Sequence, residues 1–134
     1  MADEPIRVAA VVFRDERGRV LAVRKRGTSR FMLPGGKPEP GENAAETAVR
    51  EVREEVGLSI TASSLSLLGT FRAPAANEAG REVEGTIFLA QEPLRTTPHP
   101  CAEIEELVWV APTDGDETLA LAPLLKDRIF PALT

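Results

Sequence analysis

The 134-residue sequence contains one cysteine, one histidine, no tyrosine, one tryptophan and five phenylalanines. Because Cys101 has no second cysteine to pair with, an internal disulfide and a metal site built from several thiolates are both excluded. The apolar runs, such as Val8 to Phe13, are far shorter than the roughly 20 residues of a membrane-spanning helix. The opening residues, Met1 to Pro5, are acidic rather than basic, so we expect no secretory signal and a cytoplasmic protein.

Positive charge is also scarce, with 16 Lys and Arg against 21 Asp and Glu and a formal net charge of −5. Duplex DNA and anionic membranes would gain little from such a surface, because few counterions would be released on binding. The length and a hydrophobic content of 43% predict a single domain over residues 1–134 with one sizeable core. Phosphate chemistry, if present, would therefore have to be local or metal-assisted.

The hydrophobic pattern and the turn residues predict short strands interspersed with two helices. In chain order, the predicted elements are a hairpin of Ile6 to Arg14 and Val20 to Val23, a short strand Phe31 to Leu33, a helix over 43–56, a second hairpin of Leu65 to Ala73 and Val83 to Ala90, a proline-rich loop over 92–102, a strand Leu107 to Ala111 and a helix over 117–130. Pro123 must lie in the first turn of the last helix or kink it. The mixture indicates an α+β fold or an α/β/α sandwich.

The helix over 43–56 has the clearest pattern in the chain. Its apolar residues fall within a stripe about 100° wide at the helical repeat of about 100° per residue. The stripe consists of Ala45, Ala48, Val49, Val52 and Val56. Asn43 can cap the start of the helix and Gly57 can end it.

Three carboxylates, those of Glu51, Glu54 and Glu55, lie at i, i+3 and i+4 on the side of this helix away from the apolar stripe. Like charges at these spacings repel each other. Arg50 and Arg53 are expected to project from the opposite flank. The three glutamates are either a solvated acidic face or a site for a hard cation such as Mg²⁺, which prefers oxygen ligands. Helix geometry alone leaves both interpretations open.

The spacing of the surrounding residues separates the two interpretations. Gly36 is followed by Glu42, then by Arg50-Glu51 and Glu54-Glu55, and the run closes with Val56-Gly57-Leu58. This pattern over residues 36–58 resembles the signature box of the Nudix hydrolases, the MutT-type pyrophosphohydrolases. The preceding residues 31–41, which include Pro34-Gly35-Gly36-Lys37, also look like the lead-in to that box.

The resemblance implies an α/β/α sandwich with a mixed β-sheet between helices. It also implies a divalent cation, Mg²⁺ with Mn²⁺ as a substitute, bound by Glu51, Glu54, Glu55 and a backbone carbonyl near Gly36. Arg50 and Glu54 would belong to the catalytic machinery.

Several residues in the box and just before it are expected to have structural roles. Arg50 would pair with Glu42 and so fix the loop on the helix. Gly35, Gly36, Gly41 and Gly57 are expected to allow close packing or a positive φ angle.

Nudix hydrolases use a further glutamate from a loop before a late strand, and the candidate in this chain is Glu103. Glu105, Glu106 and plain surface charge are the competing interpretations. Basic residues near the loop could contact substrate phosphates, and these are Arg24, Arg26, Arg30 and Lys37. Either Phe31 or Phe71 could stack on a base. His99, between two prolines, is expected to be a loop residue rather than a general base.

The predicted activity is metal-dependent hydrolysis of a nucleoside diphosphate linked to another moiety, with (d)NTP to (d)NMP plus pyrophosphate as the leading case. ADP-ribose or another nucleotide sugar is the alternative substrate, because Pro74 weakly resembles a proline marker of the ADP-ribose subgroup. A nucleotide-sensing domain without catalysis is disfavoured because the acidic positions are intact. A plain acidic interaction module would require the box to be a coincidence. The expected partner is a small nucleotide, bound by a monomer or homodimer.

Overall fold

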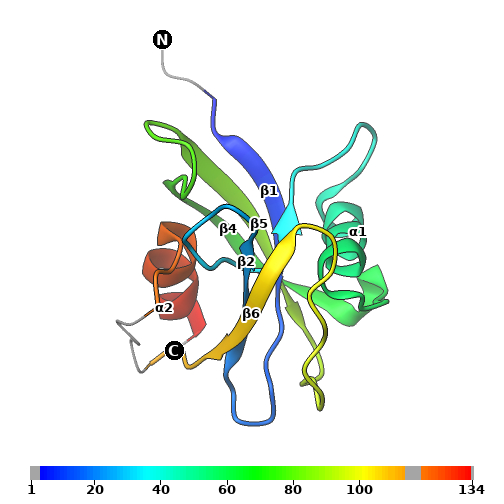
Figure 1. Cartoon of the computed structure of the whole chain (residues 1–134). Helices are drawn as coiled ribbons and strands as arrows, with labels where there is room; N and C mark the ends of the chain where they lie inside the picture. Colours follow the sequence, from blue (N-terminus) through cyan, green and yellow to red (C-terminus); the bar gives the residue numbers. More distant parts are fainter. Residues whose placement is uncertain (1–3, 114–118, 134) are drawn as a thin grey trace.

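The computed structural model describes residues 4–113 and 119–133. Its elements along the chain (Figure 1) are β1 (Ile6–Val12), β2 (Val20–Lys25), β3 (Gly35–Gly36), α1 (Ala44–Val56), the 3₁₀ turn η1 (Ala62–Ser64), β4 (Leu65–Pro74), β5 (Glu82–Ala90), β6 (Ile104–Val110), the π-helical segment η2 (Leu124–Ile129) and α2 (Phe130–Leu133). No helix of this part of the chain is long and apolar enough to span a bilayer.

The strands form two sheets. The larger is mixed, with strand order β3-β1-β5-β4, in which β1 and β5 are parallel and the other pairs are antiparallel. The smaller sheet pairs β2 with β6 in antiparallel fashion. The helix α1 lies on one side of the strands, and η2 with α2 lies on the other (Figure 1). The predicted α/β/α sandwich around a mixed sheet is therefore confirmed.

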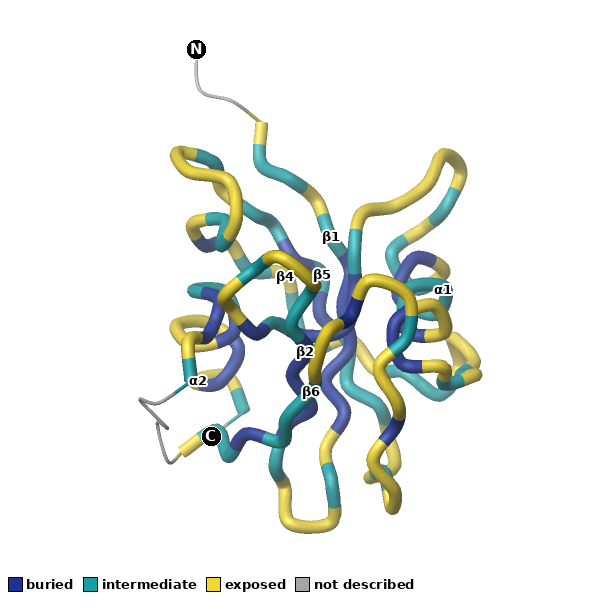
Figure 2. Tube along the Cα trace, viewed as in Figure 1, coloured by how far each residue is buried: buried dark blue, intermediate teal, exposed yellow. Residues whose placement is uncertain are grey.

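The alternation of side chains along β1 explains the two layers of the core. Ala10 and Val12 pack with the η2 side of the molecule, whereas Ala9 and Val11 pack with α1. Because both faces of this strand are covered, its residues from Ala9 to Val12 are almost completely buried (Figure 2). The continuous apolar run in the sequence thus reflects a strand at the centre of the sandwich.

The helix over 43–56 was predicted correctly, including both of its ends. Asn43 Oδ1 accepts a hydrogen bond from the Glu46 backbone N–H at 2.8 Å, and Glu46 Oε1 accepts one from the Asn43 N–H at 2.9 Å. This reciprocal capping box satisfies backbone donors that the first helical turn leaves free. Gly57 ends α1 with φ of 69°, a left-handed conformation that suits glycine.

The first predicted hairpin is largely wrong. Its two strands meet only at the turn, through the bridge between Arg14 and Val20, and then diverge into different sheets. Phe31 to Leu33 forms isolated bridges rather than a strand, and β1 pairs instead with Gly35–Gly36 on one side and with β5 on the other. Sequence patterning could not show these partners because they are distant in the chain.

The second hairpin is confirmed, since β4 and β5 pair in antiparallel register. The last strand is confirmed but begins at Ile104 rather than Leu107. The terminal helix differs from the predicted 117–130 at both ends, because η2 and α2 together run from Leu124 to Leu133. Pro123 precedes the first turn and so fixes the start. Residues 117 and 118 of the predicted helix lie outside the described residues.

Candidate active site

Arg50 fastens the loop before α1 to the helix. Its Nε donates to Glu42 Oε2 at 2.7 Å and its Nη2 donates to Glu42 Oε1 at 3.0 Å, as the sequence predicted. The same Nη2 donates to the backbone carbonyl of Lys37 at 3.0 Å. The hydrogen bonds from Arg50 lower the pKa of Glu42 to about 2, which keeps this carboxylate ionised.

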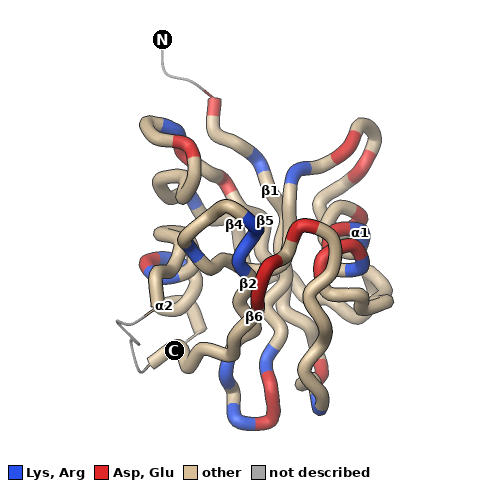
Figure 3. Tube along the Cα trace, viewed as in Figure 1, with Lys and Arg blue, Asp and Glu red and all other residues tan. Residues whose placement is uncertain are grey.

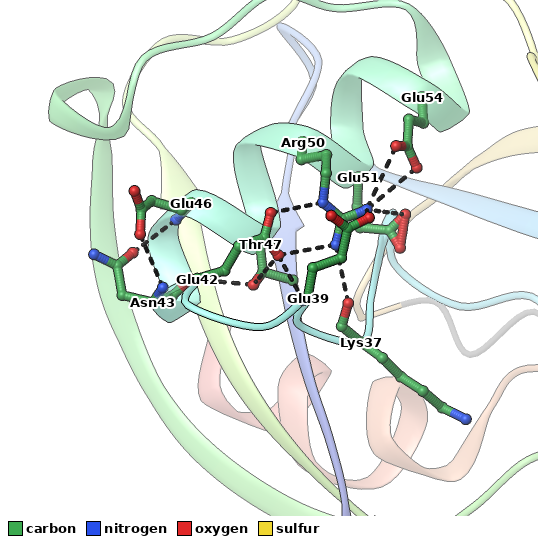
Figure 4. A network of polar contacts seen from close by, with 9 residues as sticks. All are labelled: Lys37, Glu39, Glu42, Asn43, Glu46, Thr47, Arg50, Glu51 and Glu54. Atoms are coloured by element: carbon green, nitrogen blue, oxygen red, sulfur yellow. Dashed lines mark hydrogen bonds and ion pairs between the residues drawn. The ribbon is translucent and has the colours of Figure 1, made fainter.

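Arg50 also faces the acidic residues of α1, contrary to the predicted opposite flank. Its Nη1 lies 3.3 Å from Glu54 Oε2 and 3.5 Å from Glu51 Oε1 (Figure 4). Arg50 and Glu54 are at positions i and i+4, which lie on the same face of a helix, so the predicted opposite flank was wrong. The guanidinium therefore offsets part of the repulsion among the helix glutamates.

The two glycines of β3 permit close contact between three elements. A methyl group added at Gly35 would collide with the backbone of Ala9 and Ala10 in β1. A methyl group added at Gly36 would collide with the carboxylate of Glu51 on α1. The loop therefore passes closely between β1 and α1, and the Gly36 backbone lies directly beside a carboxylate.

Glu55 is a buried acid, only 2% exposed, although the sequence analysis placed it on a face away from the core. Its Oε1 accepts a hydrogen bond from the Gly35 backbone N–H at 3.0 Å. Its Oε2 is buried without a hydrogen-bond partner among the described residues. Burial raises the pKa of Glu55 to about 8, with the nearby charge of Glu51 acting in the same direction. A buried oxygen of this kind calls for a partner.

Glu51 is partly buried, with 14% of its side chain exposed, and Glu54 is half-exposed at 51%. Desolvation raises the pKa of Glu51, and the adjacent Glu54 adds to the effect. Arg50 and Lys25 act in the opposite direction through their positive charges. Burial thus increases from Glu54 through Glu51 to Glu55. The positive charges nearby are too few to balance the charges of all three glutamates.

These residues fit a divalent cation. The available donors are carboxylate oxygens, the ligand type that Mg²⁺ prefers, and one buried oxygen of Glu55 has no hydrogen-bond partner in the described part of the chain. Within residues 4–113 and 119–133, no three acidic, histidine or cysteine side chains lie close enough together to hold a metal ion by themselves. Mg²⁺ characteristically uses only one or two carboxylates together with waters and substrate phosphates, so a partial protein cage suits it.

A pocket with a volume of about 410 Å³ opens beside Gly36 and Glu51. One wall is the sheet, with Val8 of β1 and Ile87 of β5, and the opposite wall is the helical segment η2. The tip of the β4–β5 hairpin closes one end with Pro74, Ala75, Ala76, Asn77 and Glu78. The volume and the mostly apolar lining are typical of a site for a small organic ligand.

The structure places Glu103 at the edge of the same site. Its Oε1 lies 3.4 Å from Lys25 Nζ, and its charge is one of those that raise the pKa of Glu55. The competing glutamates pair with other residues of the β2–β6 edge, Glu105 with Arg26 at 3.4 Å and Glu106 with Arg24 at 3.0 Å. Figure 3 shows the acidic beginning of β6 beside the basic end of β2.

Of the candidate substrate-binding residues Arg24, Lys37 and Phe31, only Lys37 lines the pocket. Lys37 lines the pocket and lies 3.8 Å from Glu78 across its mouth. Arg24 is engaged with Glu106 and with the carbonyl of Thr28. Phe31 is only 5% exposed and packs in the core, so the suggested stacking of a base on this ring is wrong.

Lys25 was not predicted as a site residue, yet it lines the pocket and contacts Glu103. It is the middle residue of the basic run Arg24-Lys25-Arg26 at the end of β2. Side chains alternate along a strand, so Lys25, the last residue of β2, faces the other way from Arg24, and Arg26 lies beyond the strand. This alternation is the signal that could have separated Lys25 from Arg24.

The fold and the site together define a class of protein, an α/β/α sandwich in which a glycine loop and an acidic helix lie beside an apolar pocket. The sequence profile of the NUDIX domain matches residues 4–133. The chain is 31% identical over 121 residues to a putative 8-oxo-dGTP diphosphatase of Bacillus subtilis, a match that covers 90% of this chain and 75% of that protein. The chain therefore belongs to the Nudix family.

Two further relatives agree with this assignment. The chain is 44% identical over 78 residues to mouse nucleoside diphosphate-linked moiety X motif 6, covering 56% of this chain and 25% of that protein. The crystal structure of a MutT protein from Methanosarcina mazei superimposes with a TM-score of 0.80, covering 99% of this chain and 96% of the other. Their sequence identity is 23%, so this likeness concerns the fold. The protein is therefore a Nudix hydrolase.

Proposed function

We propose that this protein hydrolyses a (deoxy)nucleoside triphosphate to the monophosphate and pyrophosphate in a Mg²⁺-dependent reaction. The observation that carries the proposal is the buried Oε2 of Glu55, which has no hydrogen-bond partner among the described residues. The neighbouring acid Glu51 lines the apolar pocket. The similarity to a diphosphatase of 8-oxo-dGTP supports the same class of substrate. A nucleotide has a charged phosphate chain and a less polar nucleoside. These two parts would occupy the acidic, cation-binding part of the site and the apolar pocket, respectively.

The residues that would hold the cation are Glu51, Glu54 and Glu55, with the Gly36 carbonyl as a further oxygen ligand. When bound, Mg²⁺ neutralises phosphate oxygens and lowers the pKa of a bound water. Mn²⁺ would substitute because it accepts the same oxygen ligands. Arg50 keeps the loop and α1 in register through Glu42 and the carbonyl of Lys37, and thereby holds the ligands in place.

Glu103 is proposed as the general base, because its carboxylate lies at the edge of the site while Glu105 and Glu106 pair elsewhere. It accepts the proton of the water whose oxygen attacks phosphorus, and the bond from phosphorus to the bridging oxygen breaks as pyrophosphate leaves. Lys25 and Lys37, both lining the pocket, would contact the phosphate chain. The apolar walls would bind the base and sugar, with Asn77 as a polar group at the far end.

An ADP-ribose-type substrate is the second candidate. The specific observation in its favour is that Pro74, the residue that resembles the subgroup marker, lines the pocket. Both substrates would be cleaved at a phosphoanhydride, so the site chemistry is common to them. They differ in the group on the far side of the diphosphate.

A nucleotide panel with product identification tests the proposal. We expect a dNTP, with 8-oxo-dGTP included, to give monophosphate and pyrophosphate in Mg²⁺ and no turnover in EDTA. Adenosine monophosphate plus ribose 5-phosphate from ADP-ribose, with no triphosphate cleaved, would select the second candidate. Full turnover of any substrate in EDTA would contradict the metal-dependent mechanism.

A further inference from the structure

The turn that carries Glu103 is tethered to the rest of the site on both sides. The Cys101 backbone N–H donates to the carbonyl of Glu55 at 2.8 Å, and the Cys101 carbonyl accepts from the Ile104 N–H at 3.0 Å. The Glu103 carbonyl accepts from the Arg26 N–H at 2.7 Å. One side of the turn is thus attached to α1 at the level of the buried acid, and the other to the end of β2.

Ala102, within this turn, has φ of 53° and is the one non-glycine residue with a positive φ among residues 4–113 and 119–133. A left-handed conformation costs energy for any residue that has a Cβ atom. Such a conformation persists only where surrounding contacts hold it, and it occurs preferentially at functional sites. The hydrogen bonds on either side of Ala102 are contacts of this kind.

The register of the small sheet explains why the turn has this form. The pairing of β2 with β6 is regular up to Arg24 and Glu106, and then shifts so that Lys25 lies opposite Ile104. The irregularity brings the residue before Ile104 level with the end of β2. The result is the contact of 3.4 Å between Lys25 Nζ and Glu103 Oε1.

We propose that Ala102 is a positioning residue, whose left-handed conformation directs Glu103 toward the reacting water. The inference rests on the proposed role of Glu103 as general base. A residue that cannot adopt this conformation would force the turn to rearrange and move the carboxylate away. Glycine, which adopts it freely, would keep the turn and remove the strain.

The test compares Ala102→Val with Ala102→Gly at 25 °C, below the melting temperature of each. Valine is β-branched and strongly disfavours a positive φ, so A102V should lower kcat by about 10²-fold, as expected for a misplaced catalytic group, with little change in KM. A102G should keep the kcat of the wild type and melt at a higher temperature. If A102V does not fold, the unbranched Ala102→Leu replaces it.

Gly18→Val is the matched control, because Gly18 has φ of 80° in the distant β1–β2 turn and a Cβ there would meet no atom within 4 Å. It should lower the melting temperature and leave kcat unchanged. The double variant with A102V and Glu103→Gln tests whether Ala102 affects kcat through Glu103. If Ala102 acts through Glu103, A102V should lower kcat no further in the E103Q background.

The kcat values of these variants distinguish a failure of the proposed role of Glu103 from a failure of the proposed role of Ala102. If E103Q retains the wild-type kcat, Glu103 is not the base and both statements are wrong. If E103Q loses activity while A102V retains it, the role of Glu103 stands and the positioning role of Ala102 is overturned. An equal loss from A102V in the wild-type and E103Q backgrounds also overturns it, because the effect would then bypass Glu103.

Discussion

The carboxylate of Glu51 lies against the backbone of Gly36, so closely that a single methyl group on the glycine would collide with it. Gly35, the preceding residue, is equally crowded, but by the backbone of Ala9 and Ala10 in β1. A flexible glutamate can move aside, whereas a strand in the middle of the core cannot. Two adjacent glycines are therefore required for different reasons, one for the site and one for the fold.

We expect Gly36→Ala to reduce mainly activity and Gly35→Ala to reduce mainly stability. G36A should displace the Glu51 carboxylate and lower kcat/KM by about 10²-fold, while changing the free energy of unfolding by less than about 1 kcal/mol. G35A should destabilise the protein by about 2 kcal/mol or more through overpacking against β1. Denaturant unfolding and a rate assay on both variants provide the check. Equal destabilisation by the two substitutions would disprove the distinction.

Glu54 should contribute to activity and hardly at all to folding. It is half-exposed, and its contact with Arg50 is a surface ion pair that stabilises by about 0.5 kcal/mol at most. Glu54→Gln should therefore leave the melting temperature in EDTA nearly unchanged, while turnover falls by orders of magnitude and the stabilisation by Mg²⁺ shrinks. Thermal melts with and without Mg²⁺ measure both effects. A variant with normal turnover and a normal Mg²⁺ shift would remove Glu54 from the metal site.

The buried acid Glu55 makes the stability of the metal-free protein depend on pH. Its pKa is about 8 in the folded protein, against an ordinary value of 4.5. Between these two values the folded state binds more protons at this group than the unfolded state does, so stability falls as pH rises. In EDTA we expect the melting temperature to drop by about 5 °C or more from roughly pH 6 to roughly pH 8.5.

Glu55→Gln is the control for this pH dependence, because glutamine does not titrate and keeps a carbonyl oxygen for the Gly35 N–H. Its melting temperature should vary clearly less over the same range. Excess Mg²⁺ should also reduce the decline in the wild type, since the cation binds the deprotonated acid. An unchanged slope in E55Q would assign the pH dependence to another group.

Lys25 should act on substrate binding more than on folding. Its side chain is 30% exposed and lines the pocket, so Lys25→Met should remove a phosphate contact and raise KM by about tenfold. Lys126→Met, at an exposed position of η2, is the matched control and should leave KM unchanged. Steady-state kinetics on the preferred nucleotide tests the pair. A K25M variant with the KM of the wild type would exclude the contact.

Local features of the chain were predictable because they depend on neighbours in sequence. The helix α1 follows from its apolar stripe, its Asn43 cap and its terminal glycine, all within 15 residues. The pairing of Arg50 with Glu42 follows from the resemblance of the box to that of the Nudix hydrolases. The β4–β5 hairpin likewise follows from two apolar runs around a short polar turn.

The burial of Glu55 and the part played by Lys25 could not be predicted from local pattern. Glu55 borders the apolar stripe of the helix, three residues after Val52, and it is withdrawn from water because the β3 loop packs over it. Lys25 reaches Glu103 only because β2 pairs with a strand that begins 79 residues later. Both facts depend on which distant segments meet.

The sequence by itself determined the helix and the spacing of its acidic residues, because both depend on local geometry alone, and the family was indicated by the resemblance of residues 36–58 to the Nudix box. Tertiary structure decided the environment of each charge. Burial, the close approach of Gly36 to Glu51 and the turn at Ala102 arise from packing between segments far apart in the chain. Since desolvation and neighbouring charge set the pKa of an acid, the chemistry of the three glutamates became visible only after the strands were assembled around them.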